Sequence, residues 1–292
     1  MAGTREPTWP RFPSAMLGKL FDAVNVNDRI DPRVALPEPV VVSCPDDMVR
    51  RCYALCLHFW EEGVVRKELL RLVKKLLRDQ TLTVEERTRY KQMRARYKHL
   101  RFAQRLYSAG HESHASFDRT TRHLGQLQDA FRTGQRERIV RYGRKLRLRL
   151  SSPMWFLTQR AARRTRLDTG AGVEAFQKRE MLRLKETIGR AHFAGEEFHA
   201  TRKIVSMHVC HYDTRRSLEP NDHDERMSRF LAMINGLMGA RHDEMVTEAA
   251  CGRYDYDAPA PLPHEIRSRL ETLVARHPLP CPAAHSTPEE AR

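Results

Sequence analysis

The stretch that decides the fold is TVEERTRYKQMRARYKHLRFAQRLY, residues 83–107. Thr83 is followed three residues later by Glu86, and such a pair is a capping box that starts a helix. Apolar and aromatic residues then recur at helical spacing on one face: Tyr90, Met93, Tyr97, Leu100, Ala103 and Tyr107. Many cations occupy the other face. We therefore predict a long amphipathic helix that has ended by Gly110.

The same helical spacing continues on both sides of this stretch. Further runs lie at 46–79, from about 116 onward, at 173–191, at 204–209 and at 227–237. Gly63 is expected to break or bend the first of them, and Asp222 with Glu225 forms a second capping pattern before the last. Neither an internal repeat nor a sustained strand alternation occurs. The sequence therefore predicts an all-α protein.

The two ends differ in composition from the middle. Residues 1–13 hold three prolines and are expected to form a loose arm before a short amphipathic helix at 14–24. Residues 246–292 are rich in proline and carry one short helical pattern around Leu270. We therefore predict a helical domain over 14–245, flanked by the arm and by a proline-rich tail.

The overall composition is that of a globular chain without a membrane span. The 292 residues are 40% hydrophobic and 30% charged, with a mean hydropathy of -0.64. No uncharged stretch approaches the roughly 18 residues of a membrane helix, and the first residues lack a secretory pattern. The six cysteines form no dense framework. We expect a cytoplasmic protein with reduced cysteines.

Positive charge is concentrated in one segment. The net charge of the chain is +15, but residues 132–166 hold twelve Arg or Lys and only one acid, Glu137. This segment therefore carries +11 and the rest of the chain only +4. Within it Leu146, Leu148 and Leu150 alternate with arginines, a pattern compatible with helix, strand or disorder.

Several short stretches resemble the tumour necrosis factor alpha-induced protein 8 (TIPE) family. The stretch LRDQTLTVEE at 77–86 is similar to the link between two helices of that family, and Arg94, sixteen residues after Arg78, matches a second family cation. Other similar stretches, in the family's order, are MLGK (16–19), SFDR (116–119), REML (179–182), IVSMHVCHYD (204–213) and MINGLM (233–238). The segment at about 120–172 looks like an insertion, and the tail beyond 245 has no counterpart.

The resemblance implies a cylinder of antiparallel helices around an elongated hydrophobic cavity. In that family the cavity takes up phospholipid acyl chains, and cations at its mouth receive phosphoinositide headgroups. The family is non-enzymatic and regulates apoptosis, inflammation and phosphoinositide signalling. The resemblance therefore implies a phospholipid-binding or transfer protein without enzyme activity or cofactor, which associates transiently with anionic membranes.

Arg78 and Arg94 are the candidate headgroup ligands under this resemblance, with Lys19 assisting at the mouth. An Arg side chain donates two parallel hydrogen bonds to a phosphate and stays charged at any relevant pH. Arg78 ends one predicted helix, and Arg94 lies about three turns into the next. The alternative interpretation is that these residues are solvated surface cations of an Arg-rich chain.

Apolar side chains beside cations are typical of membrane-contacting surfaces. Leu17 and Phe21 share one face of the helix predicted at 14–24, which either lies on a membrane or docks on the core. Trp155 and Phe156 form an apolar group inside the basic segment and are candidates for membrane insertion. Alternatively, residues 132–166 bind nucleic-acid phosphates or form a solvated insertion without a partner.

Metal binding and catalysis have little support in the sequence. Cys52 and Cys56 lie one helical turn apart, and His208, Cys210 and His211 form a second small group, so that a zinc site is conceivable. A Cys pair on an apolar helical face is more often simple packing, and we expect no metal.

Phosphate-binding loops, nucleophile elbows and metalloprotease motifs are absent from the sequence. The third functional hypothesis is a scaffold with a filled core and no ligand.

Overall fold

The computed structural model describes residues 8–279, and it confirms the predicted all-α class. The helices in this range are α1 (Ser14–Asn25), α2 (Asp46–Gly63), α3 (Arg66–Asp79), α4 (Val84–Tyr107), α5 (Ala115–Arg132), α6 (Arg136–Arg149), α7 (Ser152–Arg163), α8 (Gly170–Ile188), α9 (Gly195–Leu218), α10 (Asp222–Ala250) and α11 (His264–Arg276). Two short strands, β1 (His192–Phe193) and β2 (Ala260–Pro261), pair antiparallel. None of the helices described is long and apolar enough to cross a bilayer.

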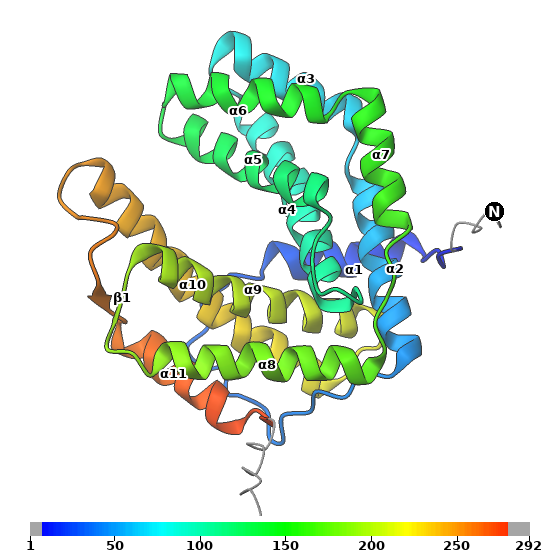
Figure 1. Ribbon diagram of the computed structural model, residues 1–292, viewed down its shortest axis with the longest axis vertical. Helices are drawn as coiled ribbons and strands as arrows, with labels where there is room; N and C mark the ends of the chain where they lie inside the picture. The colour runs from blue at the N-terminus through cyan, green and yellow to red at the C-terminus, as the bar shows by residue number, and fades with distance from the viewer. Residues whose placement is uncertain (1–7, 280–292) are drawn as a thin grey trace, which may run out of the picture.

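The helices form two halves that share α9. In Figure 1, α3, α5, α6 and α7 make the upper half, while α8, α10 and α11 make the lower half. Each half has its own hydrophobic cluster. Helix α9 contributes Met207 to the first and Val205 and Val209 to the second, and α8 also contributes to both. The long helix α4 belongs to the first cluster and packs against α2, α5 and α9. The contact between α4 and α9 thus joins the two halves.

Aromatic rings fill the interior of the upper half. The Trp60 ring centroid lies 5.6 Å from that of Tyr97, 5.4 Å from that of Phe117 and 5.2 Å from that of Trp155. These rings come from α2, α4, α5 and α7, and the Trp60 side chain is fully buried. Aromatic pairs at such separations contribute both buried area and favourable ring geometry. The elongated acyl-chain cavity implied by the resemblance stays a prediction.

The capping box predicted for α4 is confirmed. The Thr83 hydroxyl accepts a hydrogen bond from the Glu86 backbone N–H at 3.3 Å, and the Glu86 carboxylate accepts one from the Thr83 N–H at 3.1 Å. The second capping pattern was assigned to the wrong residue. The N-cap of α10 is Asn221, whose side-chain oxygen accepts from Asp224 N–H at 2.8 Å.

Removing the α4 cap should destabilise the protein measurably. We expect Thr83→Ala to lower the free energy of unfolding by about 1 kcal/mol. The Glu86 backbone N–H loses its acceptor, and the reciprocal bond from the Thr83 N–H loses its support. Urea unfolding followed by circular dichroism measures this change. The matched control is Thr88→Ala, since the exposed Thr88 hydroxyl only donates back to the carbonyl of Val84. Equal losses in the two variants would contradict a specific capping role.

The basic segment is helical, which excludes the strand and disorder alternatives. Ile139, Leu146 and Leu150 are buried at helical spacing, and α6 packs against α3 and α5. Gly143 allows close approach to α3, because a Cβ there would lie 2.8 Å from Leu77 Cδ2. Leu148, on the outward face, is 69% exposed. The alternation of leucines with arginines was therefore misleading as a local signal.

The predicted arm and tail are both more integrated than expected. Residues 8–13 are not loose, since Trp9 Nε1 donates to the Arg163 carbonyl at 2.7 Å and Phe12 N–H donates to His58 Nδ1 at 3.1 Å. The last long helix continues past 245, and α11 packs against α8 and α10 with Leu270 buried. The rest of the predicted arm and tail, 1–7 and 280–292, lies outside the described residues.

Candidate anion-binding groove

A row of cations follows one face of α4. Arg94, Lys98, Arg101 and Arg105 are spaced four, three and four residues apart, and this spacing places them on a single stripe of a helix. All four side chains are half-buried. At 1.5 Å per residue the stripe is about 16 Å long. The stripe is one of the sides on which the helix reaches water, because the apolar face of α4 is buried in the core.

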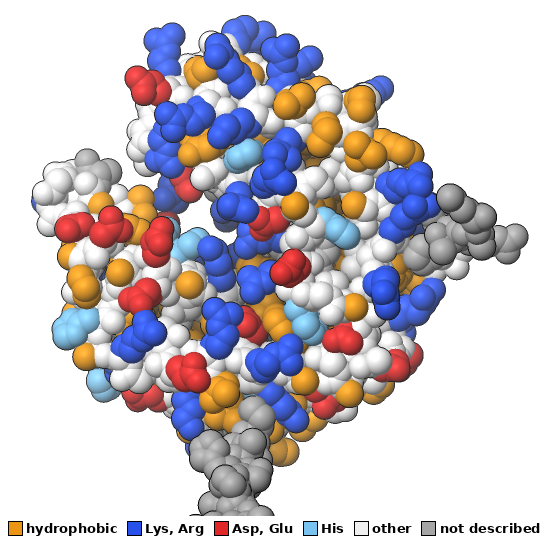
Figure 2. Space-filling view, viewed as in Figure 1, with side chains coloured by type: hydrophobic (Ala, Val, Ile, Leu, Met, Phe, Trp, Pro, Cys, Tyr) orange, Lys and Arg blue, Asp and Glu red, His pale blue; other side chains and the backbone are white. Residues whose placement is uncertain are grey.

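The neighbouring helices add further cations on either side of this stripe. Both α5 and α9 pack against α4, and α10 packs against α9. Arg122 comes from α5, while Arg202 and Lys203 come from α9. Figure 2 shows Lys and Arg side chains gathered around a hollow in the face where Figure 1 places α4, α5 and α9. We call this feature, with the α4 stripe as its floor, the cationic groove.

Acids neutralise part of the groove, and the charges of Asp243 and Asp28 act on Arg202. Arg101 lies 3.7 Å from the Asp118 carboxylate, which also pairs with Arg122, and Arg105 lies 3.8 Å from that of Glu180. The other guanidinium groups use amide oxygens instead. Arg94 donates to Gln128 Oε1 at 3.5 Å, and Arg202 donates to Asn235 Oδ1 at 3.4 Å. Amide oxygens orient a cation without cancelling its charge, so the groove keeps a surplus of positive charge.

Lys98 shows how strongly the surplus charge acts. Burial, followed by the charges of Arg202, Arg94 and Arg101, lowers the pKa of Lys98 to about 7. Its ammonium lies 5.6 Å from the Phe102 ring, and within residues 8–279 it forms no hydrogen bond or ion pair. The charge of Asp28 only partly offsets these effects. A lysine that is held among arginines and forms no ion pair with a carboxylate is a position where an anion would be bound favourably.

Lys203 extends the same pattern toward the other end of the groove. Burial and then Arg101, Arg105 and Arg122 lower the pKa of Lys203. The Lys203 ammonium also has no hydrogen-bond or ion-pair partner in the part of the chain that the structure describes. The unpaired ammonium groups of Lys98 and Lys203 thus come from α4 and α9, two helices that pack against each other.

Two histidines near the groove add no charge at neutral pH. The ring centroids of His199 and His242 lie 5.2 Å apart. Burial, followed by Lys203, His242 and Arg202, lowers the pKa of His199 to about 3. Burial and Arg202 also lower the pKa of His242. Burial is the larger cause of both shifts, and the surrounding positive charge adds to it because a second cation is disfavoured beside the first.

Of the cations predicted from the sequence, Arg94 lies in the groove. Arg78 stands at the end of α3 with its side chain 77% exposed, and its Nε donates to Asp79 Oδ1 at 2.6 Å. Lys19 is exposed on α1. Among the residues described, no hydrogen bond or ion pair connects these three side chains. They come from α1, α3 and α4, and their convergence on one mouth stays a prediction.

The predicted membrane-contact residues divide into buried and exposed side chains. Leu17 is 9% exposed and belongs to the core, so α1 docks on the protein through it. Trp155 stacks on Trp60 in the interior. The half-buried Phe21 ring lies 4.6 Å below the Arg96 guanidinium. Burial contradicts membrane contact for Leu17, whereas contact stays a prediction for the partly buried Phe21 and Trp155 and for Phe156, which is 59% exposed.

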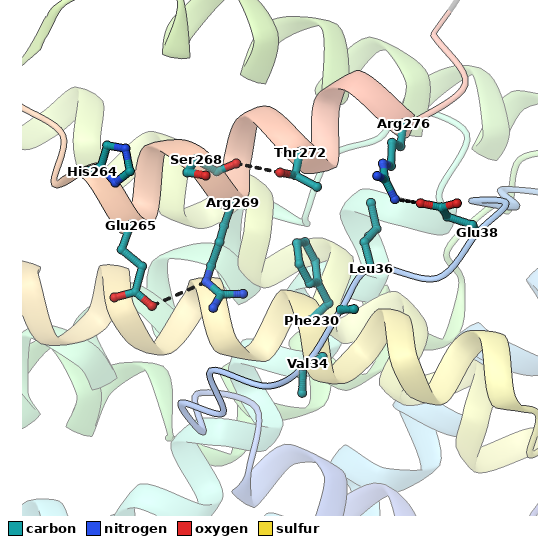
Figure 3. Close-up of a pocket in the computed structure, with 11 residues that line it drawn as sticks. Val34, Leu36, Glu38, Phe230, His264, Glu265, Ser268, Arg269, Thr272 and Arg276 are labelled. Atoms are coloured by element: carbon teal, nitrogen blue, oxygen red, sulfur yellow. Dashed lines mark hydrogen bonds and ion pairs between the residues drawn. The ribbon is translucent and has the colours of Figure 1, made fainter.

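A second concavity lies away from the groove. Figure 3 shows a pocket of about 510 Å³ between α11, Phe230 of α10 and the segment 34–38. Its charged groups are already paired, since Arg276 bonds to Glu38 and Arg269 Nε lies 3.6 Å from Glu265. Because acids and bases cancel here, the pocket offers no preference for an anion.

The Cys and His residues considered for zinc are packed in the core instead. Tyr107 and His211 share a hydrogen bond of 2.9 Å, and His99 bonds to the Thr214 hydroxyl at 3.0 Å. The Cys56 thiol lies 3.4 Å from the same hydroxyl. The described residues contain no group of three or more His, Cys, Asp or Glu placed to hold a metal ion.

Sequence reasoning missed most of the groove. The spacing of Arg94, Lys98, Arg101 and Arg105 was visible in the sequence as a helical stripe. The contribution of Arg202 and Lys203 was not, because it depends on how α9 packs against α4. Comparison with protein-family models, curated proteins and solved structures found no match to this chain, and the groove itself is the basis for a functional proposal.

Proposed function

We propose that the protein binds a molecule carrying several phosphate groups in the cationic groove. The observation that carries this proposal is the position of Lys98, which is surrounded by Arg94, Arg101 and Arg202 and is bonded to no acid among the described residues. Phosphate oxygens accept charge-assisted hydrogen bonds from both guanidinium and ammonium groups. An anion in the groove would relieve the mutual repulsion of these cations.

The length of the stripe favours several phosphates over one. The cations of α4 are distributed over about 16 Å of helix, so a single phosphate contacts only part of them. The shared ligand chemistry has two sources. One is the phosphoinositide headgroup implied by the family resemblance, and the other is a soluble ligand such as a chain of phosphates.

A titration with three probes separates these sources. Isothermal calorimetry with inositol hexakisphosphate, with linear inorganic polyphosphate and with vesicles containing phosphatidylinositol bisphosphate compares soluble and lipid-borne phosphates directly. We expect the soluble probes to bind without acyl chains, and orthophosphate to bind much more weakly. Binding to the vesicles alone would support the lipid cavity instead. No binding to any probe would contradict the proposed function.

Nucleic acid is tested in the same experiment. Single-stranded DNA carries one phosphate per nucleotide and would bind any basic surface in a salt-dependent way. If DNA bound more tightly than both soluble probes, and if changes in residues 132–166 abolished that binding, the alternative from the sequence would replace our proposal.

Ligand affinity should fall as the pH rises through about 7. The pKa of Lys98 is lowered to about 7 in the free protein, so this side chain is protonated below that pH and neutral above it. An anion binds the protonated form better and raises the pKa, so binding takes up a proton. We expect up to about a tenfold loss of polyphosphate affinity between pH 6 and 8.5, since one charged contact is worth roughly 1.5 kcal/mol or more.

The matched control for this pH dependence is Lys98→Arg. An arginine at this position stays charged throughout the range, so the variant should retain affinity at pH 8.5. Any remaining pH dependence in the variant then comes from Lys203 or from the ligand itself. Identical pH profiles for the two proteins would contradict the assignment to Lys98.

A further inference from the structure

The corner between α6 and α7 exposes large apolar side chains. Leu148 near the end of α6 is 69% exposed, and Phe156 and Leu157 of α7 are 59% and 55% exposed. Figure 2 shows hydrophobic side chains gathered where Figure 1 places the top of α7. Such a group is unusual on the surface of a chain that is 30% charged, and exposed apolar patches commonly mark contact surfaces.

Core packing fixes the direction of these side chains. On α7, Trp155 stacks on Trp60, while Thr158 and Ala162 are buried. The residues that follow Trp155 directly, Phe156 and Leu157, are therefore turned outward by the helical rotation of about 100° per residue. Each is held on a helix whose opposite face is anchored, so neither can fold back into the core.

The segment that forms the corner carries cations and no acids. From Arg138 to Leu167 the sequence contains no Asp or Glu. On α6, Arg141 and Arg144 share the outward face with Leu148, and Arg160 is exposed one turn after Phe156. Exposed apolar side chains ringed by cations match a surface that is apolar just below a negatively charged layer.

We propose that this corner docks the protein on an anionic phospholipid surface. Leu148, Phe156 and Leu157 enter the interface, and the exposed Arg141, Arg144 and Arg160 face the lipid headgroups. The leucines favour a lipid surface over nucleic acid, because aliphatic side chains bury area in acyl chains but do not stack on bases. This proposal concerns α6 and α7 and does not depend on ligand binding in the cationic groove.

Vesicle sedimentation tests the proposal. The probe is vesicles of phosphatidylcholine with 30% phosphatidylserine, which carry no polyphosphorylated headgroup, and pure phosphatidylcholine vesicles are the charge control. We expect the wild-type protein to sediment with the anionic vesicles only. Phe156→Ser combined with Leu157→Ser should reduce the bound fraction at least tenfold. Leu148→Ser provides a separate single substitution, and circular dichroism checks that each variant is folded.

Two control variants show whether vesicle binding is specific to this corner. Val84→Ser removes an apolar side chain that is 73% exposed on α4, and it should leave vesicle binding unchanged. Lys98→Gln combined with Arg101→Gln alters the groove and should also retain vesicle binding. Wild-type-like binding by the folded Phe156/Leu157 and Leu148 variants would overturn the proposal. Failure of the wild-type protein to sediment with anionic vesicles would overturn it as well. Binding that survives these changes and is displaced by single-stranded DNA would identify a nucleic-acid surface instead.

Discussion

Replacing Lys98, Arg101 and Arg202 together by Gln should weaken polyphosphate binding by about a thousandfold. Each charge-assisted contact contributes roughly 1.5 kcal/mol or more, and about 1.4 kcal/mol corresponds to a factor of ten. Lys98 and Arg101 lie on α4 and Arg202 lies on α9, so the variant removes charge from the floor of the groove and from its α9 side. Calorimetry at low and at physiological salt measures the loss, and the dependence of affinity on salt should become shallower.

The same variant separates a binding role from a structural one. Burial disfavours the charged forms of all three side chains, and Arg101 and Arg202 repel Lys98. Neutral, shorter amides remove the burial cost and the repulsion on Lys98, which offsets the loss of the long Arg101–Asp118 and Arg202–Asn235 contacts, so the free energy of unfolding should change by less than about 1 kcal/mol. Loss of binding together with loss of stability would indicate a damaged fold and not a lost ligand contact.

Arg78→Gln and Lys19→Gln are the matched controls for the groove variant. Both positions carry exposed cations outside the groove, and Arg78 is already paired with Asp79. We expect each change to alter polyphosphate affinity less than about threefold, because water and salt screen the interactions of exposed charges. A loss as large as that of the groove variant would place the ligand at the cavity mouth implied by the family resemblance.

Trp60→Ala should lower the free energy of unfolding by about 3–5 kcal/mol. The fully buried indole contacts Tyr97, Phe117 and Trp155, so its removal leaves a cavity among rings of three other helices. These rings cannot close the cavity without moving their helices. Urea unfolding followed by fluorescence and circular dichroism measures the change.

Two further variants test the origin of this loss. Trp60→Phe should cost less than the alanine change, because it keeps most ring contacts and removes an indole N–H that has no hydrogen-bond partner in the described structure. Val84→Ala, at an exposed site, should change stability by less than about 0.5 kcal/mol. Similar effects at positions 60 and 84 would mean that the upper half lacks a rigid core.

The sequence predicted those helices whose apolar spacing is regular. The capping box at Thr83 and the stripe from Tyr90 to Tyr107 give α4 directly, because local rules and burial agree there. The leucines at 146–150 misled, because burial of Leu146 and Leu150 against α3 and α5 decides the conformation and Leu148 is left outside. Trp9 and Phe12 join the fold through partners far along the chain, which no local pattern reveals.

The candidate site was less predictable than the fold. Arg94 was identified from the family resemblance, but the same helix carries Lys98, Arg101 and Arg105 on its water-facing stripe. In the sequence these cations look like an ordinary solvated face. Their importance arises only when α5 and α9 flank the stripe and exclude part of the water, which strengthens every charge in the groove.

The sharing of α9 between two hydrophobic clusters has a consequence for how the protein responds to ligand. Arg202 and Lys203 lie on this shared helix, while the remaining groove cations lie on helices of the first cluster. A bound polyanion that contacts both sets of cations would couple the two halves, so that neither half could unfold without losing ligand contacts. Heating the free protein should therefore loosen the halves more independently, and saturating ligand should merge their melting into one sharper transition at higher temperature.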